Sequence, residues 1–152
     1  MEKKIANLIG LVGQSCAGKN LVADFLEEKG YAVIDADKVA HTVLQEQREA
    51  VIARFSPYAE KQRLQLRTQE GALNRMALSV LLFSDSALLA EHEAFILPKI
   101  EARVRSLINT ALTEQPNRPV VLNAPTLHKT SLTPECSFIL YIKAPFFIRL
   151  IR

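Results

Sequence analysis

The fold is decided by residues 5–20, which read IANLIGLVGQSCAGKN. The first part, Ile5–Val12, is a largely apolar run that meets glycine at Gly13, as a buried parallel strand does. From Lys19 to Lys29 apolar residues recur at helical spacing, and Gly30 ends that pattern. The stretch therefore predicts a buried strand, a glycine-containing loop and an amphipathic helix in succession.

Further strands are predicted on both sides of a long helical segment. The first, Tyr31–Ile34, follows the helix directly and completes a βαβ unit, whose crossover is expected to be right-handed. Two more apolar, β-branched or aromatic runs lie at Val120–Leu122 and Phe138–Ile142. Together they predict an α/β fold, with a parallel β-sheet flanked by helices on both faces.

The middle of the chain is predicted to be helical. One helix is expected over Lys38–Phe55, with a break at Ser56-Pro57, and others over Ala72–Phe83 and Ser86–Thr113. Pro98 is expected to kink or divide the last of these. Because this segment is long for a plain crossover, it predicts a helical lobe, over about residues 56–115, inserted in a single domain of residues 1–152.

Composition narrows the class of protein. Hydrophobic residues make up 49% and charged residues 23% of the 152 residues, which is typical of one globular domain. The charged residues, with a net charge of +3, are interspersed along the chain and there is no Trp, which argues against nucleic-acid binding.

No apolar run approaches the length of a membrane span and no signal peptide is visible. Two cysteines make no disulfide framework. A cytoplasmic protein is predicted, and its oligomeric state is left open.

The loop carries the first functional motif. Residues 13–20 match G-x-x-x-x-G-K but lack the Ser or Thr that usually follows. In such a loop, backbone N–H groups and the helix N-terminus bind phosphate, and the lysine reaches the β- and γ-oxygens. The alternative is an ordinary strand-to-helix turn that contains glycine and lysine by chance. The buried strand before the loop and the amphipathic helix after it favour a nucleotide-binding site. The residues predicted to bind ATP are Gly13, Gln14, Ser15, Cys16, Ala17, Gly18, Lys19, Asn20 and Leu21.

Asn20 occupies the position at which a hydroxyl normally binds Mg²⁺. The amide carbonyl of Asn is also a hard oxygen ligand, so Asn20 is predicted to bind Mg²⁺ directly or through water. The alternative is that its longer side chain disfavours the metal.

Two carboxylates and one arginine are candidates for contacting the molecule that accepts the phosphoryl group. Asp35 and Asp37 follow the second strand, at the sheet edge where ligands bind in such folds. A kinase needs a carboxylate to orient the acceptor hydroxyl, so Asp37 is predicted to be catalytic and Asp35 to bind substrate. The alternative for Asp37 is a cap on a helix starting at Lys38. Arg75 is predicted to contact a phosphate or the acceptor, with a solvated helix face as its alternative.

Two segments resemble one known family, the dephospho-coenzyme A kinases. Ile9–Gly13 with Gly18-Lys19 is similar to the family's opening, and Tyr31–Ala40 is similar to its more specific second motif. Weaker similarity continues through Leu73–Arg75, Ile96–Pro98, Val120–Pro125 and Arg149–Arg152.

This resemblance implies a fold, a reaction and further site residues. The implied strand order is 2-3-1-4, with a fifth strand absent from this chain. The implied reaction transfers the γ-phosphoryl of ATP to the ribose 3′-hydroxyl of 3′-dephospho-coenzyme A, with Lys19 and Mg²⁺ stabilising charge and Asp37 positioning the hydroxyl. Arg149 and Arg152 resemble the start of a basic lid and share a helix face, which implies substrate binding.

The sequence also departs from the family pattern. Leu97 stands where the family usually has His, and Lys129 stands where it has a carboxylate. Family members are longer, and this chain ends where the lid begins, so a truncated chain is expected. Two other functions therefore stay open: another small-molecule or nucleoside monophosphate kinase, and a nucleotide-binding protein that has lost catalysis.

Overall fold

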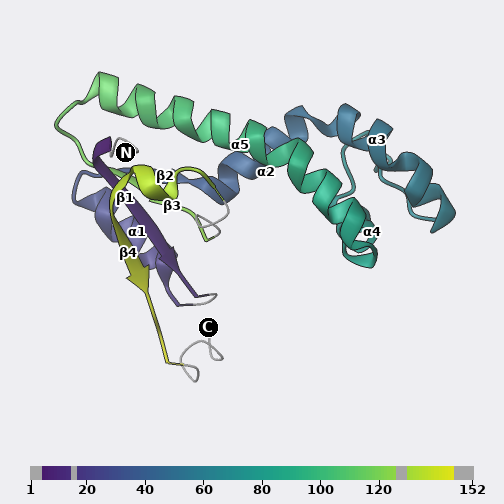
Figure 1. Cartoon of the computed structure of the whole chain (residues 1–152), viewed down its shortest axis with the longest axis horizontal. Helices are drawn as coiled ribbons and strands as arrows, with labels where there is room; N and C mark the ends of the chain where they lie inside the picture. The colour runs from purple at the N-terminus through teal and green to yellow at the C-terminus, as the bar shows by residue number, and fades with distance from the viewer. Residues whose placement is uncertain (1–4, 15–16, 126–129, 146–152) are drawn as a thin grey trace. The chain divides into compact units, whose positions relative to one another are not determined.

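A computed structural model describes residues 5–14, 17–125 and 130–145 (Figure 1). The chain divides into two compact units, one comprising residues 1–38 and 101–152 and the other Val39–Ile100. The first contains the sheet and the second is helical. The single domain with a helical lobe over about residues 56–115 stays a prediction.

The sheet of the first unit has four parallel strands in the order β2-β3-β1-β4. The strands are β1 (Ile5–Gly13), β2 (Ala32–Asp35), β3 (Val120–Asn123) and β4 (Cys136–Ile142), and a short 3₁₀ turn, η2 (Thr133–Glu135), precedes β4. The predicted fold class and the implied strand order are confirmed. Figure 1 shows β1 and β4 running side by side, as their register from Gly10 to Gly13 requires.

Helix α1 (Lys19–Glu28) covers one face of this sheet. Ile9, Leu11 and Val121 alternate with residues of the opposite face and pack against Ala23 of the helix. On the opposite face Leu8 is fully buried. Burial on both faces explains why β1 is a nearly continuous apolar run instead of an alternating one.

Strand β4 differs from its neighbours because it lies at the edge of the described sheet. Its side chains from Phe138 to Tyr141 are all exposed, including those of Ile139 and Leu140. The described part of the sheet therefore has an apolar edge.

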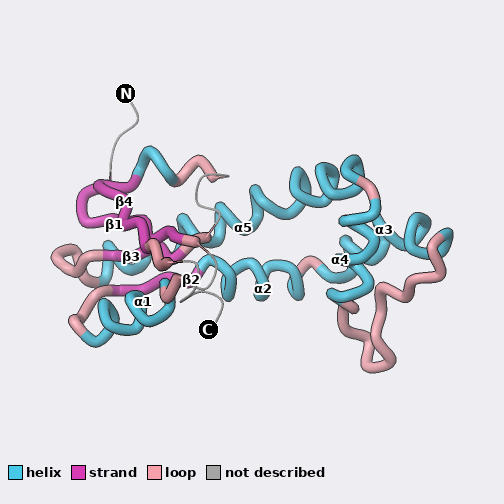
Figure 2. The backbone as a smooth tube through the Cα atoms, turned by 90° about the horizontal axis from the view of Figure 1, so that it is seen from below, coloured by secondary structure: helices cyan, strands magenta, loops and turns pink. Residues whose placement is uncertain are grey.

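The remaining helices are α2 (Ala36–Glu46), α3 (Arg48–Lys61), α4 (Arg75–Ser84) and α5 (Ser86–Glu114) (Figure 2). The single helix predicted over Lys38–Phe55 is wrong, because α2 ends at Glu46 and α3 starts at Arg48, with a turn at Gln47 between them. The helix predicted from Ala72 begins at Arg75, since Leu73 forms a β-bridge with Arg67.

The predicted break at Ser56-Pro57 is also wrong, because Pro57 lies inside α3. A proline within a helix costs about 3 kcal/mol. Val51, Phe55 and Ala59 recur every four residues along α3 and are completely or almost completely buried. Each large apolar side chain contributes about 1.5–3 kcal/mol on burial, so together they exceed that cost. Helix α5 runs through Pro98 as one helix, so the predicted division is wrong, and the predicted kink stays a prediction.

A histidine lies among the apolar side chains of the second unit. His92 is buried, its ring meets that of Phe55 edge to face at 5.6 Å between centroids, and its Nδ1 has no hydrogen-bond partner among the described residues. Burial lowers the pKa of His92 from its ordinary value of 6.5, with the nearby Glu93 acting weakly in the opposite direction. The imidazole is therefore neutral in the folded chain near pH 7.

Candidate active site

The loop begins with a glycine that the sheet itself requires. A Cβ at Gly13 would lie 2.4 Å from the backbone oxygen of Ile142, a separation that atoms cannot adopt. The next residue, Gln14, donates its backbone N–H to the same oxygen at 3.4 Å. Gly13 thus allows β1 and β4 to approach closely where the loop starts.

The second motif glycine sets the start of the helix. Gly18 has φ 94° and ψ 24°, a left-handed conformation that favours glycine, and it is the N-cap of α1. Since glycine has no side chain, it makes no side-chain capping hydrogen bond, and α1 has no acidic residue in its first turn. The first N–H groups and the positive end of the helix are therefore open to an anionic ligand.

Open space adjoins the loop. A hollow of about 360 Å³ is lined by Val12, Gly13, Gln14, Pro125, Thr133, Ile139 and Tyr141. The side-chain oxygen of Gln14 is buried without a hydrogen-bond partner among the described residues. Lys19 is the first residue of α1 and is half-buried.

The two aspartates have different structural roles. The Asp35 carboxylate accepts hydrogen bonds from the backbone N–H groups of Asp37 at 3.0 Å and Lys38 at 3.2 Å. Asp35 is therefore the N-cap of α2. The alternative that Asp37 caps a helix starting at Lys38 is wrong, because α2 begins at Ala36 and Asp37 lies in its first turn. The exposed Asp37 carboxylate makes no hydrogen bond or ion pair within the described part of the chain.

Asn123, which the sequence analysis missed, lies beside these residues. It ends β3, in register with Asp35 of β2 and Leu11 of β1, and so shares the sheet face of α1. Its Nδ2 donates to Oδ1 of Asn20 at 3.4 Å. Although Asn123 is only 5% exposed, its Oδ1 has no partner in the described chain. A polar residue ending a predicted parallel strand was the signal that could have identified it.

Arg75 belongs to the second unit. It is the first residue of α4, directly after the N-cap Asn74, whose side chain accepts from the Ala77 N–H at 3.1 Å. Its Nη2 lies 2.7 Å from Nε2 of His41 on α2. Both side chains are exposed. His41 is therefore the side chain that Arg75 contacts within the second unit. Asp37 belongs to the first unit.

Some predicted residues lie outside the described part of the chain. These are Ser15 and Cys16 of the loop, the lid residues Arg149 and Arg152, and the family departure Lys129. Of the other loop residues, Ala17 donates its N–H to the Gln14 carbonyl at 3.1 Å.

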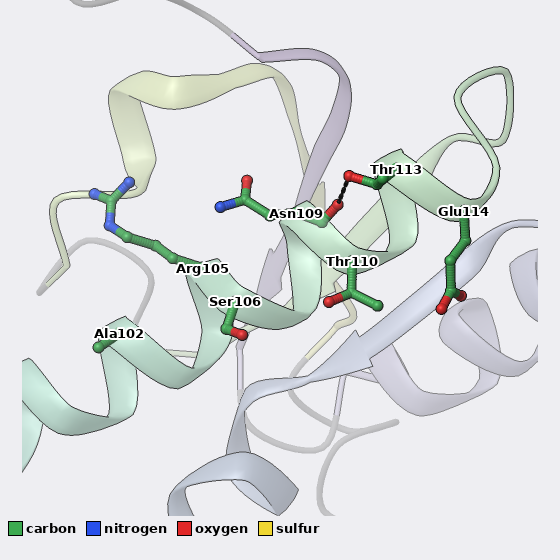
Figure 3. Close-up of a pocket in the computed structure, with 7 residues that line it drawn as sticks. All are labelled: Ala102, Arg105, Ser106, Asn109, Thr110, Thr113 and Glu114. Carbon is green, nitrogen blue, oxygen red and sulfur yellow. Dashed lines mark hydrogen bonds between the residues drawn. The ribbon is translucent and has the colours of Figure 1, made fainter.

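A larger hollow of about 670 Å³ lies along the C-terminal part of α5 and contains none of the predicted site residues (Figure 3). Its lining residues recur along one helix face, at Ala102, Arg105, Ser106, Asn109, Thr110, Thr113 and Glu114. Arg105 is engaged by Glu101 and Glu135, which raise its pKa, and Ser131 contacts it too. We interpret this hollow as the surface along one side of α5, because all of its lining residues belong to that helix.

The described residues contain neither a cluster of metal ligands nor a membrane-spanning helix. No group of three or more His, Cys, Asp or Glu side chains there is arranged to hold a metal ion. None of the helices in the described ranges has the length and apolarity to cross a membrane.

Comparison with known proteins identifies the family. The family model for dephospho-CoA kinase matches residues 7–152. The chain belongs to the dephospho-CoA kinase family. It is 49% identical to the dephospho-CoA kinase of Treponema denticola over 95% of its own length and 65% of that relative. It is 43% identical to the enzyme of that name from Treponema pallidum over 99% of its own length and 71% of the relative.

A solved structure agrees with the fold. The chain is similar to the crystal structure of TT1252 from Thermus thermophilus, with a TM-score of 0.75 and 28% sequence identity. That match covers 99% of this chain and 71% of the other. Because the chain spans only 65% of the Treponema denticola relative, the family is established for it while its own activity needs a separate argument.

Proposed function

We propose that this chain transfers the γ-phosphoryl group of ATP to the ribose 3′-hydroxyl of 3′-dephospho-coenzyme A, giving ADP and coenzyme A. The observation that carries the proposal is the junction of β1 and α1. There a left-handed Gly18 leaves the helix N-terminus without a side-chain cap, and Lys19 follows at once. Membership of the dephospho-CoA kinase family supports dephospho-coenzyme A as the acceptor.

On this proposal, the loop residues bind the triphosphate and Lys19 contacts the β- and γ-oxygens. Backbone N–H groups hold the phosphates in place, while the lysine ammonium stabilises the charge that develops on the transferring group. The acceptor hydroxyl oxygen attacks the γ-phosphorus, the bond from that phosphorus to the β–γ bridging oxygen breaks, and ADP leaves. Arg149 and Arg152 stay proposed as additional contacts to the phosphoryl group.

Asp37 is proposed to orient the acceptor hydroxyl and to accept its proton. Its exposed carboxylate has no competing contact in the described chain, unlike that of Asp35, which is occupied by the start of α2. Asp35 is therefore proposed to act on substrate only indirectly, through the position of α2. Arg75 is proposed to contact an anionic group of the acceptor.

Mg²⁺ is proposed to accompany ATP, and the residues present fit it. Asn20 and Asn123 bring two amide side chains together, and Oδ1 of Asn123 is a buried oxygen without a donor. Such neutral oxygens suit a hard cation or its bound water. Bound there, Mg²⁺ would neutralise charge on the β- and γ-phosphates. We also propose that the enzyme is cytoplasmic and acts without nucleic acid.

The amide pair also favours a second candidate function, a nucleotide-binding protein without catalysis. The site has neither the hydroxyl that usually binds Mg²⁺ at position 20 nor a carboxylate at position 123. Two neutral ligands bind Mg²⁺ more weakly than a charged one does.

A coupled assay of ADP release separates these functions. This chain and any longer natural version of it are incubated with ATP, Mg²⁺ and either dephospho-coenzyme A or other hydroxyl acceptors, including nucleoside monophosphates. ADP release that requires dephospho-coenzyme A supports the proposal, and preference for another acceptor overturns it. ATP binding without release on any acceptor identifies the second candidate.

A further inference from the structure

The contact between Arg75 and His41 determines which ring nitrogen of the histidine accepts a hydrogen bond. A guanidinium carries five N–H donors, has no acceptor and stays protonated. Since Arg75 Nη2 approaches His41 Nε2 to 2.7 Å, the arginine donates and the imidazole accepts. Because an accepting ring nitrogen carries no proton, this hydrogen bond requires the tautomer with its proton on Nδ1. This is the opposite of the tautomer that an unconstrained imidazole prefers.

The partner of Arg75 differs from those of Arg54 and Arg67 in the same unit. Arg54 donates to the carboxylate of Glu91 at 3.1 Å, and Arg67 donates to that of Glu49 at the same distance. Each of those arginine charges is compensated. Arg75 instead meets a neutral ring, and it forms no ion pair within the described residues. The contact holds the guanidinium in place while leaving its charge available.

Helix stability does not account for Arg75. Cations stabilise the C-terminal end of a helix, whereas Arg75 is the first residue of α4. The backbone there is fixed separately, by the Asn74 cap on the Ala77 N–H. The exposed pair with His41 also contributes little to folding.

We propose that His41 is a positioning residue for Arg75, holding its guanidinium through a neutral Nε2 so that the remaining N–H donors bind a phosphate of the acceptor. This inference rests on the proposed function, in which Arg75 contacts the acceptor. A free arginine side chain loses much rotamer freedom on binding, and an arginine already held loses less. His41 therefore acts on the affinity for the acceptor and leaves the transfer step unchanged.

The first part of the test is spectroscopic and independent of activity. Long-range proton–nitrogen NMR correlations of the ¹⁵N-histidine-labelled chain report which ring nitrogen carries the proton. We expect the Nδ1–H tautomer at His41 in the unsubstituted protein at neutral pH, and a return to Nε2–H in Arg75→Ala. Nε2–H in the unsubstituted protein would overturn the hydrogen bond and the proposal with it.

The second part measures KM and kcat for acceptor and ATP separately. His41→Ala should raise the acceptor KM about fivefold, the effect of one lost hydrogen bond, with kcat and the ATP KM unchanged. His41→Gln should restore the acceptor KM, because the Gln side-chain oxygen reaches about as far as Nε2. Gln45→Ala, at an exposed position one turn further along α2, is the matched control and should match the unsubstituted protein.

The failures are distinguishable. If Arg75→Ala leaves the acceptor KM unchanged, the substrate role of Arg75 in the proposed function is wrong. If Arg75→Ala raises that KM while His41→Ala does not, the positioning role of His41 is overturned and the proposed function stands. Equal increases of the acceptor-substrate KM in His41→Ala and His41→Gln would also overturn the positioning role. The hydrogen-bond acceptor that Gln retains would then have no effect.

Discussion

Replacing Asp35 and Asp37 separately by Asn and by Ala distinguishes a helix cap from a catalytic carboxylate. Asp35 accepts two backbone N–H groups at the start of α2, while Asp37 accepts none in the described chain. Asn caps a helix about as well as Asp, whereas Ala does not cap. Asn substitution therefore removes charge and keeps the cap, and Ala substitution removes both.

The magnitudes follow from these contacts. Asp35→Ala should destabilise the protein by about 1 kcal/mol, the usual loss for an N-cap, which lowers the Tm of a chain this size by about 2–4 °C. The Lys38 ammonium adds little, because it is 4.0 Å from the Asp35 carboxylate and 86% exposed. Asp35→Asn should leave the Tm within about 1 °C. Asp37→Asn loses only a favourable charge in the first turn, about 0.3–1 kcal/mol, but turnover should fall about 100-fold.

Thermal unfolding and the ADP-release assay, run on all four variants, give the answer. We expect Asp35→Ala to have the lowest Tm, and Asp37→Asn to have a near-normal Tm with very low turnover. A larger loss of Tm in Asp37→Ala than in Asp35→Ala would refute the cap assignment. Normal turnover in Asp37→Asn would retire its catalytic role and leave Asp35 as the carboxylate to examine.

Four further predictions test other parts of the molecule. Lys19→Ala should reduce turnover about 100- to 1000-fold while ATP affinity measured by calorimetry falls less, and unchanged turnover would exclude the phosphate-loop role. Asn20→Ser should preserve or raise activity and Asn20→Leu should raise the Mg²⁺ requirement, whereas identical Mg²⁺ titrations would separate position 20 from the ion. Gly13→Ala should lower the Tm, because its Cβ meets the Ile142 oxygen at 2.4 Å, and an unchanged Tm would contradict that close approach. Because the pKa of folded His92 lies below 6.5, stability should be complete above pH 6.5 and fall as the pH drops toward the lowered value. His92→Leu should remove that fall in urea titrations, and a persistent fall would assign it to another group.

The parts of the fold that the sequence predicted depend on local patterns. The strand, loop and helix between Ile5 and Glu28 combine an apolar run, two glycines and a helical period, so each local preference agrees with the final structure. Pro57 shows the limit of such reasoning. Proline is a helix breaker by local preference, but burial of Phe55 and Ala59 on either side outweighs it. That burial depends on residues distant in sequence.

The candidate site could be predicted only where one segment forms it. The phosphate loop is continuous in sequence, and its motif therefore identifies it. The roles of Asp35 and Asp37 depend on where α2 begins, and its start at Ala36 instead of Lys38, two residues earlier, moves the cap from Asp37 to Asp35. Asn123 reaches Asn20 only through the pairing of β3 with β1, which the sequence does not encode locally. The contact of His41 with Arg75 likewise joins residues 34 positions apart.

The apolar edge at β4 has a consequence for how this 152-residue chain behaves in bulk solution. A terminal strand presents unpaired backbone groups, and four successive exposed apolar side chains from Phe138 to Tyr141 accompany them. Such a strand is a template for adding strands from other chains, which ends in aggregation. Encounters between chains increase with concentration, so dilution should prolong the lifetime of the dissolved protein. A charged residue at Phe138, which is exposed and does not line the hollow beside the phosphate loop, should do the same.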